Sequence, residues 1–264
     1  MPRIRGVDLA VVDTGAGPAV LWGHGFASSV QDEGDRMLRW HRIAARNRVV
    51  RWDARGHGRS SGTLDPDDYR RDNLGRDFEA LADALGIERY AVGGVSMGAA
   101  AALHAAVDAP SRVAGLLLVL PPTAYATRAA QSGEYLTGAA LVEEQGVDAY
   151  VDRVNAQPVP EIINQFAGAY RMVPTVPERL LPAVLRGAGA SDLPSPERVR
   201  SVAAPALLLA WDTDPGHPLS TAEQLAELLP DAELEVARRL QDVITWTDRV
   251  EAFLGRLAFE PGPR

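Results

Sequence analysis

The sequence predicts an α/β fold, in which helices cover a doubly wound, mostly parallel sheet and a helical lid is inserted into the chain. Short apolar runs alternate with helical stretches along most of the sequence. Two runs, 113–120 and 206–211, are apolar almost throughout, as expected for strands buried on both faces. The segment between them is helical in pattern and rich in proline. We therefore expect a core of residues 1–120 and 201–264, with residues 121–200 as the lid.

Each element has its own local signal. The turn sequence 13–18 separates the first two β-prone runs, and residues 72–85 repeat apolar side chains at the spacing of an amphipathic helix. The charged runs 65–68 and 70–72 indicate a solvated loop that leads into this helix. In chain order, the expected strands are 7–12, 19–22, 48–52, 90–94, 113–120, 206–211 and 234–237. The expected helices are 35–45, 72–85, 97–107 and 246–257.

Composition and charge exclude several classes of function. The 264 residues carry a net charge of −8, contain no cysteine, and have arginine at all 27 basic positions. Without cysteine or lysine, the chain cannot form disulfides, thiolate metal sites, Schiff bases or a Walker-type phosphate site. The acidic balance argues against nucleic acid and membranes as partners, and no apolar stretch has signal-peptide or membrane-spanning character. We expect a cytoplasmic protein that acts on a small-molecule substrate with neither cofactor nor metal, and its oligomeric state stays open.

The strongest chemical signal is a G-x-S-x-G sequence at 94–98, between a predicted strand and a predicted helix. A nucleophile elbow requires this context, because the serine lies on a sharp turn where the glycines let strand and helix approach closely. The N-terminus of the helix adds free N–H groups and the positive end of its dipole near the hydroxyl. We therefore expect Ser96 to be a nucleophile rather than a surface serine in a glycine-rich turn.

Two further segments accompany this motif. Gly23-His24-Gly25-Phe26 follows one predicted strand, and a D-x-R-G-x-G-x-S sequence at 53–60 follows the next. Together, the three segments resemble the α/β-hydrolase family over essentially the whole chain, most closely its small lid-bearing esterases, enol-lactonases and cofactor-free haloperoxidases. The resemblance implies that the backbone N–H groups of Phe26 and Met97 form an oxyanion hole. It also implies a catalytic triad in the chain order serine, acid, histidine.

An acid loop follows the buried strand that ends at Trp211. The loop resembles that of the family, with Asp214 at the acid position and Asp212 as the competing candidate. Trp211 itself is expected to line the substrate pocket. In the family the histidine lies roughly 28 residues after the acid, where this chain has Asp242. No histidine occurs beyond His217.

The identity of the general base for Ser96 is therefore open. His217 lies three residues after Asp214, at the edge of the sheet where ligands bind, and is either a relocated base or a pocket residue that transfers no proton. Asp242 could act on Ser96 directly, although an ordinary carboxyl pKa of about 3.9 makes it a weak base for an alcohol. His24, in the loop implied to form the oxyanion hole, is the remaining alternative in the pocket. The other histidines are expected to be structural or at the surface: His41, His57 and His104.

Three functions fit these residues. The preferred one is a serine hydrolase of an ester, lactone or thioester of a small, mainly apolar molecule, with Ser96 as nucleophile, Asp214 as acid and His217 as base. The first alternative is a lyase, isomerase or cyclase that uses the same pocket and oxyanion hole, and the missing histidine motivates it. The second is a small-ligand-binding protein without turnover. It ranks last because a pure binder has less need of the retained serine motif and acid.

Overall fold

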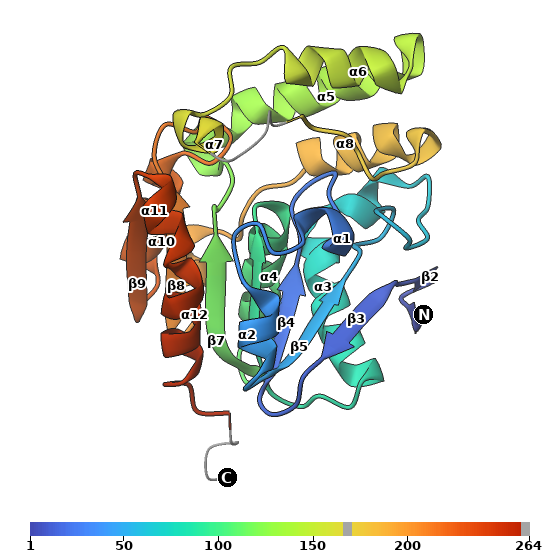
Figure 1. Cartoon of the computed structure of the whole chain (residues 1–264). Helices are drawn as coiled ribbons and strands as arrows, with labels where there is room; N and C mark the ends of the chain where they lie inside the picture. The colour runs from blue at the N-terminus through green and yellow to red at the C-terminus, as the bar shows by residue number, and fades with distance from the viewer. Residues whose placement is uncertain (166–170, 260–264) are drawn as a thin grey trace.

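The computed structural model of the chain describes residues 1–165 and 171–259. At its centre is a seven-stranded sheet in the order β3-β5-β4-β6-β7-β8-β9, in which all neighbours are parallel except β3 and β5 (Figure 1). The predicted α/β fold with a mostly parallel sheet is confirmed. The strands are β3 (Val11–Thr14), β4 (Ala19–Gly23), β5 (Arg48–Trp52), β6 (Tyr90–Val95), β7 (Val113–Val119), β8 (Ala206–Trp211) and β9 (Ala232–Ala237).

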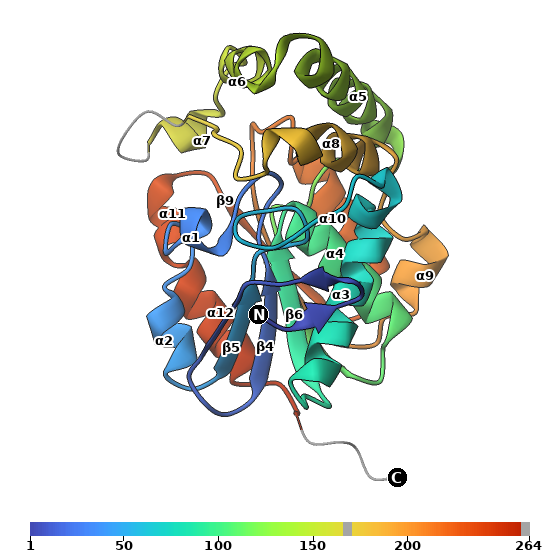
Figure 2. The ribbon, with the colours of Figure 1, turned by 90° about the vertical axis from the view of Figure 1, so that its right-hand side faces the viewer.

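Helices cover both faces of the sheet (Figure 2). This explains why every residue of β6, β7 and β8 is buried and why these strands read as continuous apolar runs. Each face has its own apolar cluster. On one face lie α3 (Arg71–Ala84), α4 (Met97–Asp108), α9 (Pro196–Arg200) and α10 (Leu219–Leu228), and on the other lie α2 (Trp40–Ala44) and α12 (Trp246–Leu254).

Between β7 and β8 the chain leaves the sheet and forms a layer of helices over the carboxyl ends of the strands (Figure 1). A third apolar cluster holds α5, α6 and α8 together. Helix α9 does not belong to this layer, because Val199 packs into the core cluster beside α4. The expected lid, 121–200, therefore includes one helix of the core. Residues 166–170 of the expected lid lie outside the described residues. The elements of this insertion are α5 (Arg128–Gln145), α6 (Val147–Asn155), α7 (Glu161–Asn164) and α8 (Leu181–Gly189).

Two expected elements are wrong in detail. The run 7–12 is divided between β2 (Val7–Asp8), which pairs with β1 (Arg3–Ile4), and β3 in the main sheet. The expected helix 35–45 begins only at Trp40, because the Asp35 carboxylate accepts a hydrogen bond from the Trp40 N–H at 3.2 Å and so satisfies a free helix donor. In the described part of the chain, no helix is long and apolar enough to cross a bilayer.

A buried carboxyl group predicts how stability depends on pH. Glu33, at the end of α1 (Val30–Glu33), accepts a hydrogen bond from Trp22 Nε1 at 2.8 Å. Burial raises the pKa of Glu33 to about 8, and the bond from Trp22 and the charge of Arg51 offset this only in part. Between pH 4.5, the ordinary value, and about 8, the folded chain holds a proton that the unfolded chain releases. The free energy of unfolding therefore falls as the pH rises through this window.

We expect Glu33→Gln to remove this dependence, because glutamine accepts the same bond from Trp22 without ionising. Urea unfolding at pH 5 and pH 8.5 measures it: the wild type should lose on the order of 3 kcal/mol more than the variant between the two pH values. If the free energy of unfolding changed with pH by the same amount in both proteins, the raised pKa of Glu33 would be contradicted.

Candidate active site

Ser96 lies on the tight turn between β6 and α4. Its backbone has φ 53° and ψ −108°, a conformation that residues other than glycine rarely adopt. Neighbouring strands and the helix fix this strained turn, because the Ser96 N–H donates to Val119 O at 3.0 Å and the Ser96 carbonyl accepts from the Ala100 N–H at 3.0 Å. The side chain of Ser96 is therefore presented at the carboxyl end of a buried strand and stays partly accessible.

The two glycines of the motif let α4 approach the sheet. A Cβ atom on Gly98 would lie 2.0 Å from the carbonyl oxygen of Gly23 in β4, and one on Gly94 would lie 2.3 Å from the carbonyl carbon of Gly98. These are contacts with backbone atoms, which have little freedom to move away. The G-x-S-x-G spacing is thus a packing requirement of the turn that carries Ser96.

His217 links Ser96 to Asp214. Its Nε2 atom lies 2.8 Å from Ser96 Oγ, and its Nδ1 atom lies 2.8 Å from Asp214 Oδ2. An ionised carboxylate can only accept, so Nδ1 carries the imidazole proton and Nε2 is left to accept from the serine hydroxyl. The structure brings these three side chains together in the geometry of a nucleophile, a base and an orienting acid.

A single turn accounts for the unusual position of the histidine. In Asp214-Pro215-Gly216-His217, the His217 N–H donates to the Asp214 carbonyl at 3.1 Å, which closes a four-residue turn. The Asp214 side chain also accepts from the Gly216 N–H at 2.9 Å. Residues three apart across such a turn lie side by side, so the imidazole reaches the carboxylate without a separate loop after β9.

Asp214 is held as an anion. Burial opposes its charged form, but hydrogen bonds from His217, from Trp211 Nε1 at 2.9 Å and from the Gly216 N–H outweigh burial and lower the pKa of Asp214 to about 2. Asp214 is therefore ionised throughout the neutral range and below it. Trp211, expected only as a pocket wall, stacks on Trp246 at 6.1 Å between ring centroids and donates its indole N–H to the acid.

We expect Trp211→Phe to lower kcat about tenfold, because Asp214 loses one of the donors that orient it toward His217. Trp246→Phe is the matched control: the two indoles stack, but the Trp246 N–H has no hydrogen-bond partner among the residues that the structure describes. Steady-state hydrolysis of 4-nitrophenyl butyrate compares the two variants. Equal kcat values in the two variants would mean that the hydrogen bond from Trp211 to Asp214 does not contribute to catalysis.

The two residues expected to form the oxyanion hole neighbour Ser96 or a residue close to it: Met97 follows Ser96 directly, and Phe26 follows Gly25, on which a Cβ atom would lie 3.9 Å from Ser96 Cβ. Met97 is the first residue of α4, where an N–H group has no partner within the helix. In residues 1–165 and 171–259, neither N–H group donates a hydrogen bond to the protein. Both donors are thus available to a ligand oxygen, as an oxyanion hole requires.

The two other histidines near this end of the sheet are structural in their contacts. The Nδ1 atom of His24 bonds to the Gly25 carbonyl at 2.7 Å, and its Nε2 accepts from the Ala54 N–H at 2.9 Å. With both nitrogens engaged and burial lowering its pKa, His24 is not positioned as an acid or base for Ser96. His57 bonds through Nδ1 to the Arg55 carbonyl at 2.9 Å, and burial lowers its pKa to about 3.

Asp242 is not assembled with the serine. Its Oδ2 accepts from the N–H groups of Arg238 and Arg239, each at 3.0 Å, and its Oδ1 from the Arg239 guanidinium at 3.1 Å. These bonds, the backbone one from Arg238 first, lower the pKa of Asp242. The carboxylate thus caps the start of α11 (Leu240–Ile244), and the hydrogen bonds of its oxygens go to Arg238 and Arg239 instead of to Ser96.

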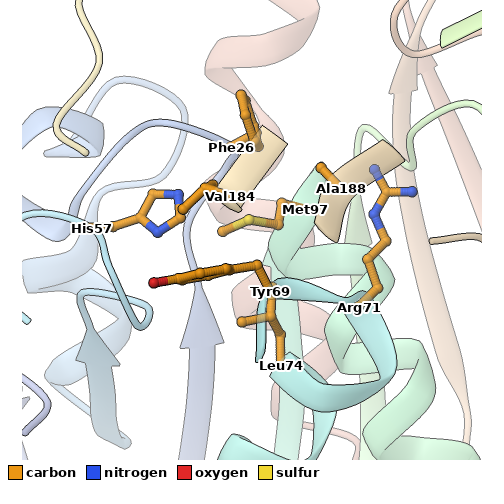
Figure 3. Close-up of a pocket in the computed structure, with 8 residues that line it drawn as sticks. All are labelled: Phe26, His57, Tyr69, Arg71, Leu74, Met97, Val184 and Ala188. Carbon is orange, nitrogen blue, oxygen red and sulfur yellow. The ribbon is translucent and has the colours of Figure 1, made fainter. Parts of the chain in front are cut away.

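A narrow pocket lies beside the proposed oxyanion donors, between the core and α8 (Figure 3). Its side chains leave almost no free volume between them. Arg71 contradicts the sequence-based expectation of a solvated charged run, because it is 2% exposed. In the described part of the chain, no three His, Asp or Glu side chains are grouped so that they could hold a metal ion. The pocket is lined by Phe26, His57, Tyr69, Arg71, Leu74, Met97, Val184 and Ala188.

Known proteins share the sequence and the fold of this chain. The sequence model of the alpha/beta hydrolase fold matches residues 18–135. A protein of Caulobacter sp. strain K31 named "Putative carbamate hydrolase RutD" is 31% identical over 215 residues, and the match covers 74% of this chain and 74% of that protein. An esterase of Thermogutta terrifontis has a TM-score of 0.76 at 22% identity, covering 95% of this chain and 94% of the esterase. An enol-lactonase of Burkholderia xenovorans has a TM-score of 0.79 at 18% identity, covering 97% of this chain and 99% of the lactonase.

Proposed function

Because the chain belongs to the alpha/beta hydrolase fold family, we propose that it is a serine hydrolase acting on an ester, lactone or thioester bond of a small, mainly apolar molecule. The observation that carries the proposal is the pair of 2.8 Å hydrogen bonds from Ser96 through His217 to Asp214. The names of relatives support it, since they include "Putative carbamate hydrolase RutD" and "3-oxoadipate enol-lactonase 2" from Acinetobacter baylyi.

In the first half of the reaction, Ser96 Oγ attacks the carbonyl carbon while His217 Nε2 takes the hydroxyl proton. The carbonyl oxygen becomes an oxyanion, which the N–H groups of Phe26 and Met97 stabilise. Asp214 stays ionised and stabilises the imidazolium through Nδ1–H. The tetrahedral intermediate then expels the alcohol or thiol, which receives the proton from His217, and an acyl-serine remains.

In the second half, His217 Nε2 takes a proton from water, and the resulting hydroxide attacks the acyl carbon. The same N–H groups stabilise the second oxyanion. Collapse breaks the acyl bond to Ser96, which recovers its proton from His217, and the carboxylic acid is released. The layer of helices α5 to α8 over the carboxyl ends of the strands is proposed to act as the lid that shields this reaction from bulk water.

The hydrolase is favoured over a lyase, isomerase or cyclase by the contacts of His217. The reason for those alternatives was the lack of a base for Ser96, and an imidazole at 2.8 Å from Oγ removes that reason. A small-ligand binder would not require the two free N–H groups and the oriented acid around one hydroxyl.

Acid-quenched mass spectrometry during turnover of 4-nitrophenyl butyrate tests the proposal. We expect 4-nitrophenolate release together with a butyryl group on the peptide that contains Ser96. Ser96→Ala should show neither. Undiminished hydrolysis by Ser96→Ala, or conversion of a carbonyl substrate without any release of an acid, would contradict the proposal.

A further inference from the structure

Arg71, the first residue of α3, is a buried cation with unused hydrogen-bond donors. It is 2% exposed, and its Nε and Nη1 atoms have no partner in residues 1–165 and 171–259. In the same residues no carboxylate oxygen lies within 4.0 Å of its guanidinium, whereas the buried Arg55 is paired with Asp77 at 2.6 Å. Figure 3 shows the Arg71 guanidinium beside Ala188, across Met97 from His57.

The surroundings leave an excess of positive charge. Arg128 is 4% exposed and donates three hydrogen bonds of its own, to Ser191 O, Thr123 Oγ1 and Ala188 O. The charge of Asp192 acts on both arginines, but its carboxylate accepts hydrogen bonds from the N–H groups of Tyr125 and Leu193. Burial, followed by repulsion from Arg128, lowers the pKa of Arg71 to about 10, so it stays charged at neutral pH.

The Tyr135 side chain hydrogen-bonds to the Arg71 guanidinium, but it is not an anion, and Nε and Nη1 stay unused. A buried cation without an anionic partner lowers the stability of the fold, and a ligand that supplies the anion offsets this loss. Arginine offers parallel N–H donors that match the two oxygens of a carboxylate. Apart from Arg71, His57 and Tyr69, the side chains that line the pocket are apolar: Phe26, Leu74, Met97, Val184 and Ala188. Phe26 and Met97 are also the residues whose N–H groups are proposed to bind the oxyanion, so this pocket adjoins the proposed position of the reacting carbonyl.

We propose that Arg71 binds a carboxylate at the far end of the acyl chain, so that the substrates are esters or lactones of acids that carry a second carboxylate beyond an apolar spacer. The inference rests on the proposed hydrolase function and names its substrate class. Because the side chains nearly fill the pocket, the flexible Met97 side chain has to move when such a chain enters.

Matched ester pairs test the inference. The probes are 4-nitrophenyl monoesters of glutaric, adipic, pimelic and suberic acid, each beside the neutral analogue in which a methyl ester replaces the free carboxylate. At one or more chain lengths, wild-type kcat/KM should favour the anionic ester by at least about tenfold. Arg71→Met should lose this preference, because its kcat/KM falls much more for the anionic ester than for the neutral ester. Arg71→Lys should keep part of the preference.

Two controls separate binding from folding. Arg76→Met, at an exposed arginine of the same helix, should keep the full preference for the anionic ester. Urea unfolding should show Arg71→Met to be at least as stable as the wild type, since the variant removes a buried unpartnered charge. If Arg71 had only a structural role, Arg71→Met would be less stable, and the ratio of kcat/KM between the anionic and the neutral ester would be unchanged. That result would overturn the inference.

The outcomes for the inference and for the hydrolase function are distinguishable. One outcome is that the wild type hydrolyses the neutral esters, that Ser96→Ala abolishes this hydrolysis, and that the anionic ester is preferred at no chain length. This outcome overturns the role of Arg71 and leaves the hydrolase function standing. If no ester is hydrolysed, the hydrolase function fails, and thermal unfolding with free glutarate, adipate and suberate tests the anion site. An increase in Tm that Arg71→Met abolishes supports the site, and no increase with any dicarboxylate overturns it.

Discussion

Replacing His217 with glutamine should lower kcat for ester hydrolysis about 10⁴-fold. Glutamine can still hydrogen-bond to Ser96 or Asp214, but it cannot take the proton from Oγ or return it to the leaving group. The residual rate comes from the oxyanion donors and from binding. Because His217 is on a partly exposed turn, the free energy of unfolding should change by less than about 1 kcal/mol. Hydrolysis of 4-nitrophenyl butyrate and urea unfolding measure the two quantities.

Two variants control for this substitution. His41→Gln alters an exposed histidine 3.5 Å from Asp35, and Asp242→Asn alters the cap of α11, so both should keep kcat within about twofold. If His217→Gln retained more than about a tenth of the wild-type kcat, the serine would have another base. A large loss of kcat in Asp242→Asn without loss of stability would point to the carboxylate instead.

Gly98→Ala should destabilise the protein by about 3 to 5 kcal/mol, a large part of the stability of an ordinary domain. The added methyl group would lie 2.0 Å from Gly23 O and 2.3 Å from Gly23 C, both in the backbone of a central strand. Relief requires α4 to move off the sheet, and α4 begins at the turn that carries Ser96. The midpoint of urea unfolding, followed by circular dichroism, should fall accordingly, and activity should fall in the fraction that stays folded.

Gly133→Ala is the matched control for the same chemical change. Gly133 is exposed within α5, and an added Cβ there meets nothing within 4 Å. Alanine has the higher helix propensity, so this variant should gain about 0.5 to 1 kcal/mol. A Gly98→Ala protein as stable as Gly133→Ala would show that the close approach of α4 to β4 is not required.

Much of the fold could be predicted because its signals are local. The apolar runs at 113–120 and 206–211 identify strands buried on both faces, and a proline-rich helical stretch between them marks the insertion. The sequence-based predictions were wrong where a single polar contact determines where a strand or a helix begins or ends. The carbonyl of Pro2 accepts from the Leu9 N–H, which accompanies the division of the run 7–12, and Asp35 binds the N–H of Trp40 and shortens the expected helix.

The site was predictable to the extent that its residues lie in short motifs. The turn at Ser96 and the turn from Asp214 to His217 are each a few residues long, so the spacing of their residues in the sequence predicts how the side chains lie. Counting along the chain points to Asp242 only if the loop after β9 has the length usual in the family, whereas the contacts of Asp242 cap a helix. Nothing in the sequence indicates that Arg71 is buried, because a run of charged residues predicts a solvated segment. The burial depends on tertiary packing under α8, which the local sequence does not show.

The most direct test of the central claim, that His217 activates Ser96, is the rate of labelling by a fluorophosphonate followed by intact mass. The wild type should gain a single adduct, and Ser96→Ala should gain none. His217→Ala should react at least about 100-fold more slowly, because the hydroxyl then has no base. An unlabelled wild type, or equal labelling rates in the wild type and His217→Ala, would contradict the claim.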